Sequence, residues 1–173
     1  MELWDVYDKN RKPKGYKIMR GGDRRLGHGE YHITVHVCVF SSDGRMLIQK
    51  RAASKGLWGG LWDISAGGSV LAGEMSSDGA QRELSEELGI DAVFSGTTPG
   101  MTLYNKDCIS DYYMITLDVD TTTLNVPNDE VSDARYATLD EVLDMIQAKE
   151  FVPYRESVVR ILFEMREHSG AWS

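Results

Sequence analysis

The sequence predicts an α/β fold in which helices cover a mixed β-sheet. Three observations support this prediction. Apolar residues alternate along residues 32–40, as in a half-buried strand, and a second strand-like segment follows at 46–51. Towards the C-terminus, residues 139–146 and 154–165 carry apolar side chains at helical spacing. At 173 residues the chain fits one core, so we expect a single domain over residues 1–173.

The first thirty residues are expected to form an N-terminal extension. They are polar, contain glycines and carry a group of cations, namely Lys12, Lys14, Lys17, Arg20, Arg24 and Arg25. We expect a strand and a loop over residues 1–30.

The central part of the chain predicts the sheet. The apolar face of the first strand is formed by Ile33, Val35, Val37 and Val39. The sequence SSDGR then makes a turn and Met46 to Arg51 returns, which predicts a β-hairpin. A short strand is expected over Trp62 to Ala66, leading into Gly67 and Gly68. Further strands are expected near Ala92 to Phe94, Met101 to Tyr104 and Asp111 to Leu117.

Two helices are expected near the C-terminus. Thr138 and Glu141 have the spacing of a capping box, so a helix is expected to start there. Its apolar residues are Leu139, Val142, Leu143 and Ile146. A last amphipathic helix is expected to carry Tyr154, Val158, Ile161, Leu162 and Met165.

Residues 68–90, GSVLAGEMSSDGAQRELSEELGI, contain the most informative pattern in the chain. They match G-x5-E-x7-R-E-U-x-E-E-x-G-U, where U is a bulky aliphatic residue. Every fixed position is filled, by Gly68, Glu74, Arg82, Glu83, Leu84, Glu86, Glu87, Gly89 and Ile90. A motif of this length is far more specific than a lone glycine loop.

On a helix this spacing predicts a metal site. Glu83, Glu86 and Glu87 share one side, and an apolar stripe of Ala80, Leu84 and Leu88 lies opposite. Crowded carboxylates repel one another unless a cation or proton neutralises them, and hard divalent ions prefer oxygen ligands. We expect Ser76 or Ser77 to cap the helix start and Gly89 to adopt the left-handed conformation at its end.

An acidic helix is more often a solvated surface than a binding site. A solvated face, however, needs neither Gly68, nor Glu74 in the preceding loop, nor Arg82 one turn before Glu86. Arg82 can orient Glu86, and each of the three residues has a use in a site for a metal-bound diphosphate. The functional interpretation is therefore preferred.

The segment resembles the signature box of the Nudix hydrolases, and the match is complete. The resemblance implies an α/β/α architecture. It also implies a loop–helix–loop that binds Mg²⁺ or Mn²⁺ and hydrolyses nucleoside diphosphates linked to another group. Outside the box, a looser similarity extends from about Glu30 to Glu141 through the strand pattern and the WDIS sequence before the glycines. The box does not identify the substrate.

The expected mechanism is metal-assisted substitution at phosphorus. We expect Glu83 and Glu87, with Glu86 and Glu74, to hold the metal, which polarises phosphoryl oxygens and lowers the pKa of a bound water. Glu86 is the preferred base because Arg82 can hold it in place. Nudix relatives also recruit a base from a later loop, and Glu130 is such a candidate.

Lys50 and Arg51, at the end of the expected hairpin, are candidates for neutralising phosphate charge as the leaving group departs. A solvated strand end explains these two cations equally well.

Histidines and tryptophans near the box have alternative roles. His32 and His36 lie four residues apart on one strand, so their α-carbons are about 13 Å apart, too far for easy binding of one ion. We expect these two histidines, and His28 nearby, to form hydrogen bonds in or beside the sheet. Trp58 is a candidate for stacking or for lining the cleft, and Trp62 for core packing.

Two other function classes remain open. The sequence WDISAGGSV with His32 upstream also resembles isopentenyl diphosphate isomerase, a Nudix-fold enzyme that transfers protons. The isomerases place a cysteine and a histidine where this chain has Gly67 and Ser69, so hydrolysis is preferred. A noncatalytic Nudix domain that senses nucleotides is the third class, although such domains usually lose the box carboxylates that are kept here.

Composition limits the partners. There are 27 acidic and 19 basic residues, a net charge of −8, which argues against a nonspecific surface for nucleic acids or anionic membranes. The two cysteines, Cys38 and Cys108, form no metal-binding spacing, and the N-terminus lacks signal-peptide features. No apolar run approaches the roughly 20 residues that span a bilayer. We therefore expect a cytoplasmic enzyme with a small diphosphate substrate, and a homodimer is a reasonable expectation.

Overall fold

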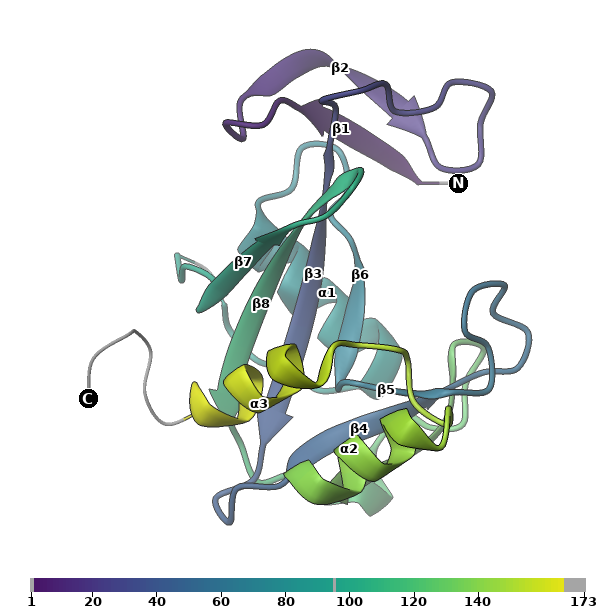
Figure 1. The fold of residues 1–173 in the computed structure, drawn as a ribbon, viewed down its shortest axis with the longest axis vertical. Coiled ribbons are helices and arrows are strands. Elements are labelled where there is room, and N and C mark those ends of the chain that lie inside the picture. The colour runs from purple at the N-terminus through teal and green to yellow at the C-terminus, as the bar shows by residue number, and fades with distance from the viewer. Residues whose placement is uncertain (1, 95, 167–173) are drawn as a thin grey trace.

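A mixed sheet forms the centre of the molecule, and a separate hairpin of N-terminal residues lies above it in Figure 1. The structure, a computed structural model, describes residues 2–94 and 96–166. The strands of the large sheet are β3 (His32–Phe40), β4 (Met46–Arg51), β5 (Trp62–Asp63), β6 (Ala66–Ser69), β7 (Met101–Tyr104), β8 (Cys108–Thr116) and β9 (Val131–Ala137). Their order is β5-β4-β3-β8-β7, with β6 paired to β3 and β9 paired to β4. The predicted α/β fold with a mixed sheet is confirmed, because β3 runs parallel to β8 and antiparallel to β6.

The sheet divides beside β3. The predicted bounds of β3 and β4 are confirmed, but the two strands pair only at Phe40 and Met46. Beyond that point β3 pairs with β6, while β4 pairs with β5 and β9. Ser65 lies in the gap, where its hydroxyl accepts from Val39 N at 2.8 Å and donates to Leu47 O. The expected hairpin is therefore paired only next to its turn, and its two strands diverge beyond it.

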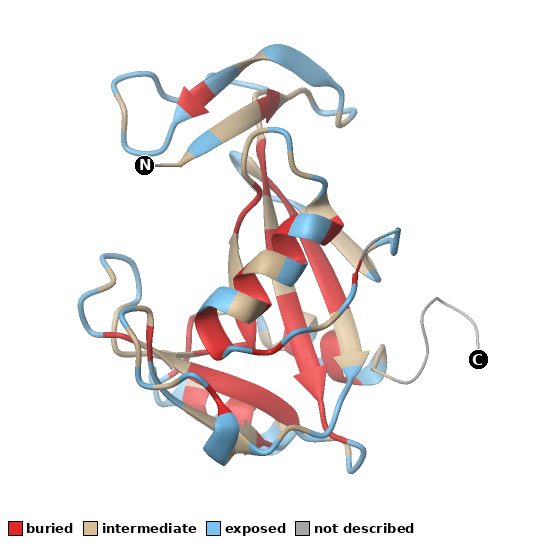
Figure 2. Cartoon of the chain, turned by 180° about the vertical axis from the view of Figure 1, so that it is seen from behind, coloured by how far each residue is buried: buried red, intermediate tan, exposed pale blue. Residues whose placement is uncertain are grey.

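Helices cover both faces of the sheet. On one face, α1 (Ser76–Leu88) buries Ala80, Leu84 and Leu88 against the apolar side of β3. Figure 2 shows this helix in front of the sheet, with buried residues along it. On the other face lie α2 (Leu139–Gln147) and α3 (Glu156–Glu164). The predicted capping box of α2 is confirmed, because Thr138 and Glu141 each accept a hydrogen bond from the other's backbone N–H.

The N-terminal extension contains two strands where one was expected. β1 (Leu3–Tyr7) and β2 (Pro13–Met19) pair as an antiparallel hairpin at the top of Figure 1. Tyr7 exchanges backbone hydrogen bonds with Tyr31 at the entrance to β3. The hairpin is thus attached to the start of the central strand.

Several predicted boundaries were wrong. The expected strand over 62–66 is interrupted, so that Gly67 and Gly68 lie inside β6 and not after a strand. Residues 92–94 are not a strand, and β8 begins at Cys108, earlier than expected. Tyr154 precedes α3, and β9 and a short 3₁₀ helix (Thr121–Thr123) had not been predicted. None of the helices in the described part of the chain is long and apolar enough to cross a membrane.

Candidate active site

Gly68 allows the acidic helix to approach the sheet. A Cβ atom at this position would overlap the carboxylate of Glu83. Glu83 is buried, with 9% of its surface exposed, directly against the backbone of β6. The glycine at the start of the motif is therefore explained by close packing of backbone against carboxylate.

The two ends of α1 differ in how well they were predicted. The cap is Met75, and Asp78 accepts a hydrogen bond from its backbone N–H at 3.3 Å, so the expected capping by Ser76 or Ser77 is wrong. Both serines lie inside the first turn, and the Ser76 hydroxyl donates to Asp111 of β8. At the other end Gly89 has φ 71°, which confirms the predicted left-handed termination.

Arg82 lies at the centre of the acidic cluster. Its guanidinium donates to Glu74 at 2.9 Å, to Glu83 at 2.8 Å and to Glu86 at 3.0 Å. A further bond of 2.9 Å runs to the backbone oxygen of Ser69 on β6. One cation therefore connects the loop before the helix, two carboxylates of the helix and the strand beneath it.

Arg82 influences its partners unequally. Burial raises the pKa of Glu74, but hydrogen bonds from Arg82 and from Leu71 N outweigh it and hold that pKa below its usual value. Burial also acts on Glu83 and raises its pKa despite the contact with Arg82, and the nearby charges of Glu86 and Glu130 add to the increase. Glu86 is the exposed member of the group, with 59% of its side chain accessible.

Glu87 is the most buried carboxylate of the box, with 2% of its surface exposed. It accepts hydrogen bonds from Gln49 Nε2 at 3.0 Å and from Gly67 N at 3.1 Å. Burial raises its pKa well above the usual value, and the charges of Glu83, Asp63 and Glu130 add to this increase. Both donors are neutral amides, and no cationic side chain of the described residues bonds to Glu87.

The donor set fits a divalent cation. Among residues 2–94 and 96–166, no three His, Cys, Asp or Glu side chains already converge on a common point that could hold a metal. Glu83 and Glu86 turn towards Arg82 instead. Among the described residues, however, no cation pairs with the buried Glu87 carboxylate, and Gln49 Oε1 beside it is buried without a hydrogen-bond partner. Oxygen donors with excess negative charge are what Mg²⁺ and Mn²⁺ require.

The expected phosphate-binding cations separate onto two faces. In β4, Gln49 points to Glu87, so the alternation of side chains directs Lys50 to the opposite face, where its Nζ lies 5.8 Å from the ring centre of Trp62. Arg51 forms an ion pair of 3.2 Å with the buried Asp63. The structure thus brings Arg51, but not Lys50, to the side of the acidic cluster.

Glu130 lies close to the box, as the proposed role of a second base requires. Its charge raises the pKa of both Glu83 and Glu87, and its carboxylate pairs with Lys55 at 2.6 Å. Lys55 and Gln49 are site residues that sequence reasoning missed. A glutamine in the apolar run MLIQ of a buried strand was a usable signal, whereas nothing in the glycine-rich loop distinguished Lys55.

The histidines are used mainly for stacking. His32 lies on Trp4 with ring centres 4.1 Å apart, and among the described residues its Nδ1 has no hydrogen-bond partner, so the expected hydrogen bond is not formed at this nitrogen. His36 lies on Tyr112 at 4.6 Å, and its Nδ1 is 3.5 Å from the hydroxyl of Tyr154. His28 lies in the exposed loop before β3. Trp62 packs beside the core cluster that α2 and α3 cover, as expected.

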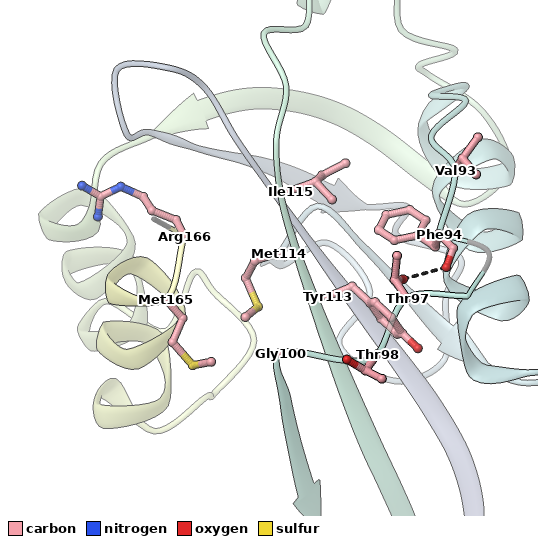
Figure 3. A pocket seen from close by; sticks show the side chains of 10 residues that line it. All are labelled: Val93, Phe94, Thr97, Thr98, Gly100, Tyr113, Met114, Ile115, Met165 and Arg166. Atoms are coloured by element: carbon pink, nitrogen blue, oxygen red, sulfur yellow. Dashed lines mark hydrogen bonds between the residues drawn. The ribbon is translucent and has the colours of Figure 1, made fainter. Parts of the chain in front are cut away.

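Two cavities lie on the sheet. The smaller, of about 320 Å³, is bounded by the loop after Ile90, the end of β8 and the end of α3, and Figure 3 shows its lining. Its ten lining residues include no carboxylate and none of the box residues. The larger cavity, of about 740 Å³, includes His36 and Trp58 in its lining. Neither lining includes a residue of the box, but His36 in the larger one lies next to Gly67, whose N–H donates to Glu87.

Comparison with known proteins identifies relatives of this chain. The NUDIX domain family matches residues 30–160. A Listeria monocytogenes protein described as an uncharacterized Nudix hydrolase is 42% identical over 154 residues, covering 89% of this chain and 90% of its own. An isopentenyl-diphosphate Delta-isomerase of Pectobacterium atrosepticum is 30% identical over 147 residues, covering 79% and 76%. A crystal structure of a Deinococcus radiodurans protein superimposes with a TM-score of 0.74 at 22% identity, covering 93% and 99%, and shows the same fold.

Proposed function

The chain belongs to the Nudix family, and on that premise we propose that it is a metal-dependent pyrophosphohydrolase, which cleaves a diphosphate linkage by attack of water at phosphorus. The substrate class is a nucleoside diphosphate derivative or a related small molecule. The observation that carries the proposal is Glu87, a buried carboxylate whose only hydrogen-bond partners among the described residues are neutral amides. In its ionised form such a group is costly to a fold unless a cation joins it, and its raised pKa reflects that cost.

The residues of the box have different proposed roles, in metal binding and in positioning the metal ligands. Glu83 and Glu87, with Glu86 and Glu74 available beside them, are the candidates to hold Mg²⁺ or Mn²⁺. When bound, the ion supplies a Lewis acid that polarises the phosphoryl oxygens and acidifies water. Gln49 and the Gly67 amide fix one carboxylate oxygen of Glu87. Arg82 holds Glu74, Glu83 and Glu86 in fixed positions.

In the proposed reaction, the oxygen of a water molecule bonds to one phosphorus atom while the bond from that phosphorus to the bridging oxygen breaks. The bridging oxygen leaves with the electron pair. Glu86 takes the proton of the water, because its carboxylate is exposed to solvent and is oriented by Arg82 at 3.0 Å. Glu130 is the second candidate base, since its loop faces Glu83 and Glu87. Arg51 and Lys55 are the candidates to neutralise the leaving phosphate.

The test is a panel of diphosphate compounds assayed with Mg²⁺, with Mn²⁺ and with a chelator. Turnover is expected with either metal and none with the chelator. Glu86→Gln is expected to lower kcat by about a hundredfold or more, the contribution of one acid–base group. Glu87→Gln, which alters a candidate metal ligand, is expected to lower activity by about tenfold or more. Glu164→Gln, on the exposed side of α3, is the matched control and is expected to keep full activity. Full metal-dependent turnover by both box variants would refute the mechanism.

Isomerase relatives support a second candidate, proton transfer on isopentenyl diphosphate. Gly67 and Ser69 offer neither a thiol nor an imidazole at the corresponding places, and the described structure puts both residues on β6. Deuterium exchange into isopentenyl diphosphate distinguishes the reactions, because the isomerase exchanges carbon-bound hydrogen and a hydrolase does not. A nucleotide sensor without catalysis would give neither exchange nor phosphate release.

A further inference from the structure

The larger cavity lies on the face of the sheet opposite α1. Thr34 and His36 of β3 and Ser110 and Tyr112 of β8 form its floor. These residues alternate with Val35, which packs on the α1 side. The walls are mostly apolar and are formed by Leu57, Trp58, Leu103, Tyr104, Val152 and Val158.

The polar groups of the floor mostly bond to one another. The Ser110 hydroxyl lies 2.9 Å from that of Thr34 and accepts from Asn105 Nδ2 at 2.8 Å. Tyr154 donates to Asp63 at 3.1 Å and lies 3.5 Å from His36. Asp107 and Arg155 also line the cavity, but most of its lining surface is apolar, so the cavity offers mainly contact surface.

A single strand separates this cavity from the acidic cluster. Side-chain positions 67 and 68 of β6 face opposite sides: a Cβ on Gly67 would come within 3.4 Å of the His36 ring, whereas one on Gly68 would overlap Glu83. The Gly67 N–H points to Glu87. In the described part of the chain β6 pairs with β3 alone, so no second strand covers its other edge. A molecule crossing that edge would meet Glu87 at one end and the cavity at the other.

The loop between β4 and β5 contributes residues both to the surroundings of the acidic cluster and to the cavity. Lys55 pairs with Glu130 beside the acidic cluster, and Trp58, three residues later, lines the cavity. A Cβ on Gly59 would overlap the carbonyl oxygen of Lys55, so the loop is tightly wound around this glycine. Trp58 has φ 56° and 43% of its surface exposed. The loop thus holds a large aromatic side chain at the mouth of the cavity in a conformation that only tight surroundings maintain.

We propose that this cavity binds the group attached to the diphosphate, and that this group is apolar or aromatic and stacks on Trp58. The inference rests on the proposed function, which positions the diphosphate at Glu87. Recognition is by contact area and not by a hydrogen-bond pattern. Stacking of a base on an aromatic side chain contributes about 1–3 kcal/mol, which corresponds to roughly five- to 150-fold in affinity.

The test compares three probes that cannot be hydrolysed, because carbon replaces the bridging oxygen. They are methylenediphosphonate, α,β-methylene-ADP and the geranyl ester of methylenediphosphonate, titrated calorimetrically with Mg²⁺. At least one of the two organic probes is expected to bind about tenfold or more tightly than methylenediphosphonate. Trp58→Ala is expected to weaken that probe by about fivefold or more. The same substitution should leave the affinity for methylenediphosphonate within about twofold. Leu117→Ala, an exposed apolar residue outside the cavity, is the control and should change no affinity.

If Trp58→Ala weakens binding of the geranyl probe alone, the group attached to the diphosphate is aliphatic. If it weakens binding of the adenosine probe alone, that group is aromatic. The proposal is overturned if neither organic probe binds more tightly than methylenediphosphonate, or if Trp58→Ala weakens all three probes equally. Because these probes are never cleaved, a protein that shows the expected pattern but hydrolyses no diphosphate would refute the proposed function alone. Hydrolysis without the pattern would refute only this inference.

Discussion

At the scale of single residues, Gly68 sets the distance between sheet and acidic helix. We expect Gly68→Ala to displace the Glu83 carboxylate, because the added methyl group would occupy its position. Disturbing a group that positions metal ligands typically lowers metal affinity by about ten- to a hundredfold. The Mg²⁺ concentration for half-maximal activity should rise by about that factor. Gly56→Ala is the control, since its Cβ would meet open space, and an equal effect of the two substitutions would contradict this account.

His36 makes stability depend on pH. Burial lowers its pKa to about 4, and the charge of Asp111 only partly opposes this. In the unfolded chain the pKa is about 6.5, so between these two values the unfolded chain binds a proton that the folded one does not. The free energy of unfolding should therefore fall as pH falls through this window. Urea denaturation at about pH 7.5 and at about pH 5 measures how much unfolding free energy is lost on acidification. This loss should be smaller in His36→Gln than in the unsubstituted protein, by about 1–2 kcal/mol. Equal losses in the two proteins would contradict the assignment.

At the scale of elements, a partly buried ion pair links the N-terminal hairpin to the sheet, in addition to the backbone bonds between Tyr7 and Tyr31. Arg11, in the turn between β1 and β2, forms two bonds to Asp111 of β8, which is fully buried. Asp111 also accepts from Ser76 in the first turn of α1 and from Thr102 of β7. Hairpin, helix and sheet thus meet at a single carboxylate.

Removing Arg11 should therefore destabilise the protein strongly. Arg11→Ala leaves the Asp111 charge buried without its cation, which costs about 3 kcal/mol or more in such pairs. Arg20→Ala removes an exposed pair with Glu2 from the same hairpin and should cost less than about 1 kcal/mol. Adding Asp111→Asn to Arg11→Ala should recover part of the loss, because the buried charge is gone. Thermal unfolding of the four proteins tests this, and similar costs for Arg11→Ala and Arg20→Ala would be the contrary result.

Elements with a local periodic signal were predictable from the sequence. β3, β4 and β7 have the predicted bounds because their own residues specify a strand, and α2 because its cap is local. The division between β3 and β4 was not predictable, since it depends on Ser65 inserting from a distant segment. The Ser76 cap failed for a similar reason, because Asp111 competes for its hydroxyl.

At the scale of the whole molecule, the sheet separates two environments. Carboxylates gather on the α1 side around Arg82, and apolar and aromatic side chains line the cavity on the other side. The box could be predicted because its residues are consecutive in the chain. The cavity could not, because it combines β3 and β8 with residues 57–58 and 152–158. Substrate specificity is therefore a property of the tertiary fold and not of the motif.

The central claim is that water attacks phosphorus in a diphosphate at this site. The most direct measurement is turnover of a hydrolysed member of the diphosphate panel in ¹⁸O-labelled water with Mg²⁺, followed by mass spectrometry of the phosphate products. The account predicts one ¹⁸O atom in one phosphate product for each bond cleaved, with formation of that product lowered about tenfold or more in Glu87→Gln, which alters a candidate metal ligand. Products without ¹⁸O, or unchanged product formation by Glu87→Gln, would contradict it.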